Sequence, residues 1–420
     1  MREMKDSGVT WIGEIPKEWE ISRFKDHYKN IKEIAGDSAS DYERLALTLN
    51  GVIKRPKDDS DGLQPKEFDT YQILRENDFV FKMIDLQNIS TSRVGLSPYT
   101  GLVSPAYIRF TSRKENQFNK FTYYFLMSMY YNCVFNSLGG DGVRSALNAS
   151  DMGTLMIPNP NLTTQQKIAA HLDRKCTQID ALISNAQQQI EKLKAYKQSV
   201  ITETVTKGLN PDVAMKDSGV EWIGEIPEHW DAVPIRSLFR IKKDIIGHEP
   251  DTVLSITQTG LKIKDITENS GQMANSYAHY QIVNVGDFAM NHMDLLTGGV
   301  GISEFEGVTS PDYRVFVMRN ADMNSRYFLY VFQMYYRNKI FYAFGQGAAN
   351  LGRWRLPAQN FNTVAVPLSP VEEQNSIVTF LDEKCTQIDK LIALKQQKIE
   401  KLQQYKKSLI YEYVTGKKEV

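Results

Sequence analysis

Several features are scarce in this sequence, and each scarcity excludes a class of protein. Three cysteines in 420 residues are too few for a disulfide framework, which suits a reducing cytoplasm. No run approaches the roughly 18 apolar residues of a membrane span. The first six residues hold no apolar segment, so we expect no signal peptide. Fifty basic residues balance fifty acidic ones, which excludes nucleic-acid binding by bulk charge but leaves local basic patches open.

Sequence motifs for catalysis and metal binding are also missing. The six histidines are scattered, and none lies in an H-E-x-x-H pattern or beside a cysteine pair at zinc spacing. The phosphate-binding pattern G-x-x-x-x-G-K-[ST] and the nucleophile pattern G-x-S-x-G do not occur. We therefore expect no catalytic residue, no metal site and no cofactor in this chain.

Internal repetition, in contrast, is extensive. Residues 4–19 and 215–230 share thirteen of sixteen positions at an offset of 211, around the block W-I-G-E-I-P-x-x-W. Residues 165–206 and 374–415 share 25 of 42 positions at an offset of 209, including an identical K-C-T-Q-I-D. Because both offsets are half the chain length, the protein is one unit written twice. Its length also exceeds the ~150 residues of a usual domain.

The segments between the shared blocks are related only faintly. Asp78 faces Asp287 at the common offset, and the S-P-A-Y at 104–107 echoes the S-P-D-Y at 310–313. Scaffold positions are kept whereas the residues between them have diverged. This pattern favours one fold adapted to two different targets, with simple drift after duplication as the alternative.

The second pair of repeats predicts two long helices. Capping boxes at Thr163 and Ser369 predict where they begin, and Gly208 and Gly416 where they end. About 45 residues at ~1.5 Å each give a rod of about 65–70 Å, and two such rods should pack side by side. A heptad-like apolar seam runs through each, and its positions are assigned to a coiled coil or a partner contact: Leu172, Ile179, Ile183, Ile190, Leu193, Leu381, Ile388, Ile392, Ile399 and Leu402.

Short β-rich runs and two aromatic helical runs, 121–131 and 327–336, fill the remaining segments. The predicted fold class is α/β (α+β), with two globular domains separated by two long antiparallel helices in a coiled coil and an internal pseudo-twofold repeat. Lys197 and Lys395 interrupt the apolar seam, so they either extend to solvent or mark a partner contact. The predicted boundaries are 1–160, 161–210, 211–367 and 368–420.

Candidate nucleic-acid contacts gather in turn-rich loops at matching places in the two copies. Residues 20–160 carry 17 basic and 17 acidic residues, and 231–370 carry 13 and 12, so only folding could build a basic face. Arg can read guanine, Asn or Gln can read adenine, and Lys mostly holds phosphate. A solvated loop side chain is the alternative for each. The candidates are Asn50, Lys54, Arg55, Lys57, Lys82, Arg93, Arg144, Thr257, Gln258, Lys262, Lys264, Asn291, His292, Gln346, Asn350, Arg353 and Arg355.

The doubled W-I-G-E-I-P-x-x-W block, the S-P-x-Y stretches and the I-P or V-P lead into Q-x-x-I-x-x-x-L-D-x-K-x-x-x-I-D resemble the specificity subunit of a type I restriction-modification system. The resemblance covers nearly the whole chain. It implies that residues about 20–160 and 231–367 are target-recognition domains, each reading one half of a split double-stranded DNA site. The helices would fix the unspecified gap between the halves.

The same resemblance implies partners and a cellular setting. Two methyltransferase subunits would methylate adenine N6 with S-adenosylmethionine, and restriction subunits would use ATP and Mg²⁺, in the cytoplasm and without a membrane. The residues by themselves leave two alternatives. One is a non-DNA-binding assembly scaffold whose variable domains bind proteins, and the other is an enzyme whose site is too divergent to recognise.

Overall fold

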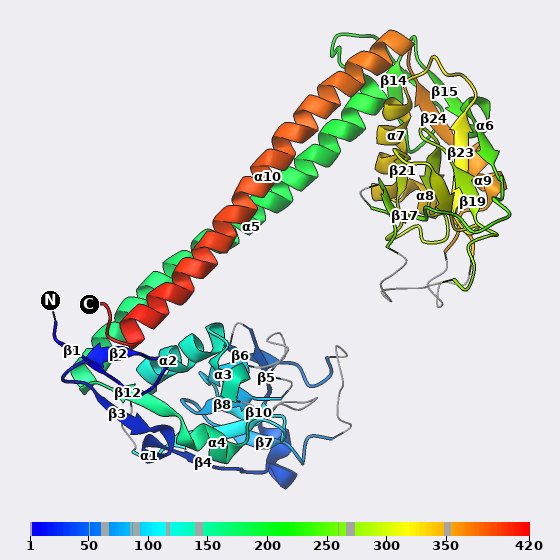
Figure 1. The fold of residues 1–420 in the computed structure, drawn as a ribbon. Coiled ribbons are helices and arrows are strands. Elements are labelled where there is room, and N and C mark those ends of the chain that lie inside the picture. Colours follow the sequence, from blue (N-terminus) through cyan, green and yellow to red (C-terminus); the bar gives the residue numbers. More distant parts are fainter. Residues whose placement is uncertain are drawn as a thin grey trace. The chain divides into compact units, whose positions relative to one another are not determined.

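The computed structural model describes residues 2–49, 51–59, 67–84, 86, 93–114, 118–138, 146–258, 260–265, 274–347 and 354–420. Its contacts divide the chain into two compact units. Unit 1 comprises residues 1–187 and 396–420, and unit 2 comprises residues 188–395. Each unit therefore contains one globular domain and one half of each long helix (Figure 1).

The two long helices are α5 (Leu162–Lys207) and α10 (Val371–Val414). Within each unit they lie side by side in opposite directions (Figure 1), which confirms the predicted antiparallel coiled coil. Lys406 Nζ lies 2.7 Å from Asp180 in unit 1, and Lys197 Nζ lies 2.7 Å from Asp389 in unit 2. These pairs occupy equivalent positions of the repeat, so one interhelical ion pair is formed twice. Among the described residues, no helix combines the length and apolarity that crossing a membrane requires.

The apolar seam is buried along much of both helices. Its most enclosed positions are 7% exposed or less: Leu172, Ile179, Ile190, Leu381, Ile388 and Ile399. The other four are half-buried: Ile183, Leu193, Ile392 and Leu402. Lys395 Nζ donates to Gln189 Oε1 on the neighbouring helix at 2.5 Å, as Lys197 does to Asp389. Both lysines that interrupt the seam therefore contact the other helix, which corrects their assignment to solvent or to an external partner.

The ends of the long helices follow the predicted glycines. Gly208 comes directly after α5 with φ +75°, and Gly416 follows α10 with φ +72°. Only glycine adopts this left-handed backbone without strain, so both helices stop where the repeat places it.

The starts of the long helices differ from the prediction of capping boxes. Asn161 caps α5, because its Oδ1 accepts from Thr164 N at 2.9 Å, and Thr163 already lies inside the helix. Ser369 does not cap α10, whose first residue is Val371. The Ser369 carbonyl instead accepts from the buried Gln374 side chain at 2.8 Å, and its hydroxyl has no partner within the described residues. The capping-box prediction was therefore wrong, because the side-chain hydrogen bonds at the two helix starts come from Asn161 and Gln374, which lie outside the predicted patterns.

The globular domain of unit 1 combines a hairpin, a two-stranded ladder and two four-stranded sheets. The hairpin pairs β1 with β2, and the ladder pairs β12 with β3. The two larger sheets have the strand orders β6-β5-β10-β7 and β4-β11-β8-β9. Pairing is antiparallel except between β10 and β5. The strands and short helices are β1 (Met4–Asp6), β2 (Glu14–Pro16), β3 (Glu20–Arg23), α1 (Phe24–His27), β4 (Tyr28–Asn30), η1 (Gly36–Asp41), β5 (Arg44–Thr48), β6 (Gly51–Arg55), β7 (Gln72–Leu74), β8 (Phe79–Lys82), β9 (Arg93–Leu96), β10 (Gly101–Val103), β11 (Ile108–Ser112), α2 (Asn119–Tyr131), α3 (Val134–Leu138), α4 (Ala149–Thr154) and β12 (Met156–Asn159).

Apart from η1, unit 2 repeats this element order in the residues that the structure describes. Strands β13–β24 correspond in sequence to β1–β12, and helices α6–α9 to α1–α4. Its four-stranded sheet is β16-β23-β20-β21, and the second sheet is present as the pairs β17-β18 and β19-β22. The elements are β13 (Met215–Asp217), β14 (Glu225–Pro227), β15 (Asp231–Pro234), α6 (Ile235–Leu238), β16 (Phe239–Lys242), β17 (Leu254–Thr257), β18 (Gly260–Ile263), β19 (Gln281–Val283), β20 (Phe288–Met290), β21 (Val300–Ile302), β22 (Gly307–Thr309), β23 (Arg314–Met318), α7 (Ser325–Arg337), α8 (Ile340–Ala343), α9 (Ala358–Thr363) and β24 (Ala365–Leu368).

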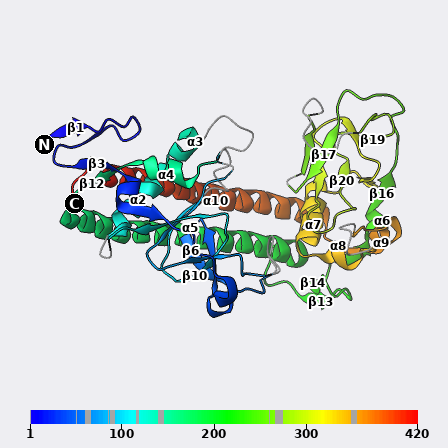
Figure 2. The same ribbon diagram turned by 90° about the horizontal axis from the view of Figure 1, so that it is seen from below.

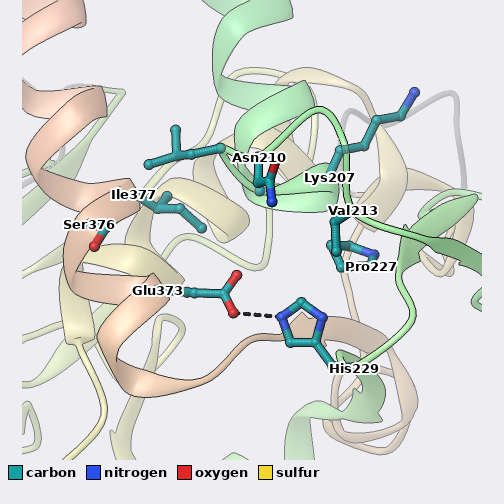
Figure 3. A pocket seen from close by; sticks show the side chains of 10 residues that line it. Lys207, Asn210, Val213, Pro227, His229, Glu373, Ser376 and Ile377 are labelled. Atoms are coloured by element: carbon teal, nitrogen blue, oxygen red, sulfur yellow. Dashed lines mark hydrogen bonds and ion pairs between the residues drawn. The ribbon is translucent and has the colours of Figure 1, made fainter.

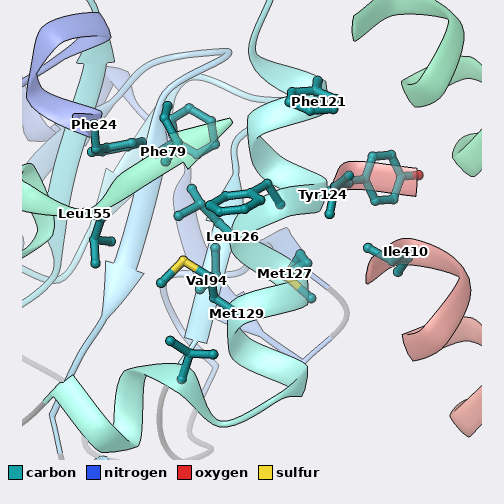
Figure 4. Close-up of a cluster of buried hydrophobic side chains, with 14 of the residues drawn as sticks. Phe24, Phe79, Val94, Phe121, Tyr124, Leu126, Met127, Met129, Leu155 and Ile410 are labelled. Carbon is teal, nitrogen blue, oxygen red and sulfur yellow. The ribbon is translucent and has the colours of Figure 1, made fainter. Parts of the chain in front are cut away.

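An aromatic helix joins each globular domain to the long helices. In unit 1, α2 packs its apolar side chains on the sheet while Tyr124 and Met127 lie near Ile410 of α10 (Figure 4). Tyr124 Oη donates to Asp173 of α5 at 2.6 Å. In unit 2, Tyr330 of α7 donates in the same way to Asp382 of α10 at 2.7 Å. The repeated aspartate thus holds its domain on the helix in both units.

The duplicated W-I-G-E-I-P block packs against the end of a long helix. Trp19 and Trp230 are both fully buried, and each ring lies close to the glycine that ends a helix, Gly416 for Trp19 and Gly208 for Trp230. In unit 1 this brings both chain ends together (Figure 2), where Lys417 Nζ donates to the carbonyl of Ile12 at 2.6 Å. Because the same tryptophan–glycine contact is made twice, both copies of the block are under the same packing constraint.

Candidate nucleic-acid interface

The basic candidates of unit 1 lie on and after the β5–β6 hairpin. Lys54 Nζ pairs with Glu43 at 2.5 Å, and Arg55 Nε pairs with Asp59 at 2.5 Å. Lys57 Nζ donates to a backbone carbonyl at 2.8 Å. Lys54 and Lys57 remain exposed, so their existing partners hold them at the surface without removing them from solvent.

Other candidates of unit 1 flank the β8–β9 connection. Lys82 ends β8 and pairs in register with Arg93, the first residue of β9. The Lys82 side chain is half-buried. Both residues therefore lie at the loop end of one hairpin. Four predicted contacts lie outside the described residues: Asn50, Arg144, Asn350 and Arg353.

Glycines let the candidate hairpin of each unit pack closely on the neighbouring strand. A Cβ at Gly95 of β9 would lie 2.6 Å from a Leu47 methyl group on β5. A Cβ at Gly301 of β21 would lie 2.8 Å from a Leu261 methyl group on β18. Real side chains do not approach so closely. Glycine at both positions therefore allows the β5–β6 hairpin to pack against β9 in unit 1, and the β17–β18 hairpin to pack against β21 in unit 2.

Three predicted loops of unit 2 meet in one cluster. Gln258, at the tip of the β17–β18 hairpin, donates to the carbonyl of Thr297 at 3.1 Å and so reaches the loop that begins with Asn291 and His292. The His292 carbonyl accepts from Leu356 N at 2.8 Å, which joins that loop to the segment carrying Arg355. The structure therefore brings together candidates that are about 100 residues apart in the sequence.

The remaining candidates of unit 2 border this cluster. Gln346 and Arg355 exchange two backbone hydrogen bonds of 2.8 and 3.1 Å, and both side chains are exposed. Thr257 Oγ1 donates to the Gly260 carbonyl at 2.8 Å, so it closes the hairpin turn. Lys262 is exposed, whereas Lys264 is half-buried.

A buried arginine beneath the cluster was missed from the sequence. Arg314, the first residue of β23, is 5% exposed, and its Nη2 donates to the Leu356 carbonyl at 2.8 Å. Its guanidinium carbon lies 4.7 Å from the centre of the Phe361 ring. Burial, together with Arg314 and Arg355, lowers the pKa of His292 to about 4. The only sequence signal was a single cation at the head of an apolar strand.

Among the described residues, each globular domain also contains a buried ion pair. Asp78 accepts from Arg109 Nε at 2.6 Å in unit 1, and Asp287 accepts from Lys242 Nζ at 2.6 Å in unit 2. The two aspartates are equivalent, and each also accepts a backbone hydrogen bond in the turn before its strand. These cations are satisfied inside the fold and belong to the frame rather than to the surface.

Matching grooves run between the aromatic helix and the long helices. Equivalent residues line both, with Tyr124, Cys176, Thr177, Asp180 and Lys406 in unit 1 and Tyr330, Cys385, Thr386, Asp389 and Lys197 in unit 2. Burial raises the pKa of the Cys176 thiol to about 11 and raises that of Cys385 as well. Both thiols therefore stay protonated near neutral pH and act as small packing groups.

A smaller cavity in unit 2 lies between the end of α5 and the start of α10 (Figure 3). Glu373 lies against it and accepts from Trp230 Nε1 at 3.0 Å, while its other oxygen lies 2.6 Å from His229 Nε2. The carboxylate thus holds the repeated block to the helix. In the part of the chain that the structure describes, no three His, Cys, Asp or Glu side chains form a group suited to a metal ion.

Comparison with known proteins identifies the repeat. The family model described as the type I restriction modification DNA specificity domain matches this chain twice, at residues 16–193 and 227–404. The specificity subunit assigned to the type I restriction enzyme MjaX of Methanocaldococcus jannaschii is 25% identical, over 97% of this chain and 95% of its own length. The MjaVIII specificity subunit of the same organism is 23% identical, over 96% and 93%.

A solved structure supports the fold. One chain, from work on complex assembly and conformational transition of the type I R-M system, superimposes with a TM-score of 0.66 at 13% identity, and 95% of this chain and 98% of that chain are covered. The doubled family match supports sequence-specific recognition over the alternative of a scaffold that does not bind DNA. The chain belongs to the type I restriction-modification DNA specificity family and carries two copies of its domain.

Proposed function

We propose that this chain reads a bipartite DNA target with an unspecified gap and directs an adenine-N6 methyltransferase and restriction subunits to it. One recognition domain reads each half-site. The observation that carries the proposal is the doubled specificity domain, in which the frame is kept and the loops differ. Different loops on one frame allow the two half-sites to have different sequences.

The chemistry belongs to the partners in this proposal. The methyltransferase subunits supply S-adenosylmethionine, and the restriction subunits supply ATP and Mg²⁺, so this chain needs no cofactor and performs no catalysis. The complex acts in the cytoplasm. The family match to a DNA specificity domain supports this division of labour.

Two methyltransferase subunits dock on equivalent surfaces of the long helices. Support comes from apolar side chains that the repeat keeps exposed. Leu182 and Tyr405 in unit 1 are 47% and 51% exposed, and their equivalents Leu391 and Tyr196 in unit 2 are 47% and 49% exposed. An exposed leucine and tyrosine kept at the same positions of both copies fit one partner bound twice.

The docking surface can be tested by substituting one leucine at a time. Leu182→Ser and Leu391→Ser should each remove one methyltransferase subunit from the complex, and the double variant should remove both, as measured by native mass spectrometry. Leu394→Ser is the matched control, because Leu394 is exposed but the equivalent residue of the first repeat is the polar Asn185. Loss of both subunits from a single variant would contradict two independent docking sites.

The recognition role is tested by mapping modified adenines in genomic DNA. Cells with this chain and its methyltransferase should show a two-part motif with an unspecified gap, and cells lacking only this chain should lose it. An unchanged methylation map would contradict the proposed function. The map also identifies the target needed for binding experiments.

A further inference from the structure

Arg314 is a buried cation without a complete set of partners. It is 5% exposed, and one guanidinium nitrogen, Nη1, has no acceptor within the described residues. The other terminal nitrogen has only the Leu356 carbonyl, at 2.8 Å. Burial without a carboxylate lowers the pKa of Arg314 to about 10. Such an arrangement costs stability, so the unpaired nitrogen needs an explanation, and a bound anionic ligand is one that would offset the cost.

Among its neighbours, Arg355 adds positive charge, whereas His292, whose pKa is lowered to about 4, is neutral near pH 7. His292 Nδ1 also lacks a partner in the described part of the chain. Arg355 is exposed, and no ion pair to it is found among the described residues. Asp294, the acid of this loop, accepts instead from Leu296 N at 3.0 Å and Thr297 N at 2.9 Å. The guanidinium groups of Arg314 and Arg355 therefore have no carboxylate paired with them among the described residues.

Unit 1 shows that the fold does not need these three polar side chains. The positions of Arg314, His292 and Arg355 correspond to Ile108, Met83 and Ala146. The backbone contact survives there, because Leu147 N donates to the Met83 carbonyl at 3.1 Å as Leu356 N does to His292. An apolar version of the same site folds in the same way, so the two arginines and the histidine of unit 2 serve something other than the frame.

We propose that Arg314, His292 and Arg355 form a binding site for a phosphodiester of the DNA backbone, present in the second recognition domain only. The inference rests on the proposed DNA-recognition function. Arg355 contacts the phosphate from the surface, and Arg314 contributes its charge from a low-dielectric position beneath, where an uncompensated charge acts strongly. Base reading fits less well, because the Oδ1 of the adjacent Asn291 already accepts from Met293 N and Asp294 N.

The salt dependence of DNA binding tests this site. We would measure Kd for the complex of this chain with its methyltransferase, on a duplex carrying the mapped target, between 0.05 and 0.3 M KCl. Removing one phosphate contact should reduce the slope of log Kd against log salt by about 1, with affinity about fivefold weaker near 0.15 M. We expect this for Arg314→Met and for Arg355→Gln, with base preferences unchanged in both half-sites.

Control variants separate the phosphate site from other effects. Arg240→Gln removes an exposed charge of the same domain, on β16, and should leave the slope nearly unchanged. If Arg314→Met fails to fold, Arg355→Gln still tests the phosphate contact, because Arg355 is exposed.

Two results would overturn the inference, and a third would contradict the proposed function. An unchanged slope in Arg355→Gln would exclude a phosphate contact. Lost discrimination at one base pair with an unchanged slope would reassign the site to base reading. Absence of sequence-specific binding by the unmodified complex would instead contradict the proposed function on which the site depends.

Discussion

The two recognition domains solve the same electrostatic problem with different strands. Asp78 and Asp287 occupy one position of the fold, yet their cations come from β11 in unit 1 and from β16 in unit 2. Val315 of β23 occupies the position of Arg109, and it pairs directly with Lys242 in register. The cation has therefore moved to its cross-strand neighbour while the carboxylate stayed. The fold requires a charge partner at this place but not a particular strand to supply it.

The largest expected effect comes from exchanging a whole domain. Replacing residues 20–160 with the corresponding domain of another family member should change one half-site completely and leave the other unchanged, because each domain sits in its own compact unit. The measurement is the methylated motif in genomic DNA. A change in both half-sites would show that the domains do not read independently.

Removing the cation of a buried pair should destabilise one domain strongly. Lys242→Ile leaves Asp287 buried and uncompensated, which should cost about 3–5 kcal/mol of unfolding free energy. Adding Val315→Arg transplants the arrangement of unit 1 and should restore at least half of the loss. Denaturant unfolding of the methyltransferase complex measures both variants. No recovery of stability in the double variant would mean that a cation on β23 cannot replace the cation on β16.

Lengthening both helices should change the gap and neither half-site. Four residues inserted after Ala186 and four after Lys395 add about one helical turn, ~6 Å, at the equivalent point of each repeat. The ion pairs Lys406–Asp180 and Lys197–Asp389 then stay in register within their units. The methylated motif should gain one or two base pairs of gap. An insertion after Ala186 alone is the control, and it should disturb the pairing of the helices.

The smallest effect is expected where the two units agree most closely. Lys197→Met and Lys406→Met each remove a partly exposed interhelical pair, so each should cost only about 0.5–1 kcal/mol. The two values should be similar, because the positions are equivalent. Double-mutant cycles with Asp389→Asn and Asp180→Asn measure each coupling. A large difference between the units would show that the helices are less symmetric than their sequence.

The sequence by itself determined the duplication, the two long helices and their ends. Helical periodicity and glycine at Gly208 and Gly416 act over a few residues, so local patterns reveal them. The starts of the two helices were not predicted correctly. Asn161 caps α5, and the Gln374 side chain donates to the Ser369 carbonyl before α10. The S/T-x-x-E/Q pattern describes neither contact.

Only the tertiary structure decided which charges meet. Loop candidates such as Gln258, His292 and Arg355 were visible as residue types, but their grouping depends on hydrogen bonds between distant segments. Arg109 and Lys242 look like surface cations in the sequence, and strand register buries them against aspartates. Arg314 shares their burial without their partner. Cross-strand register determines which charged side chains are buried and which are paired, and local periodicity does not encode that register. The pairing of charges in the two domains therefore could not be predicted from the sequence.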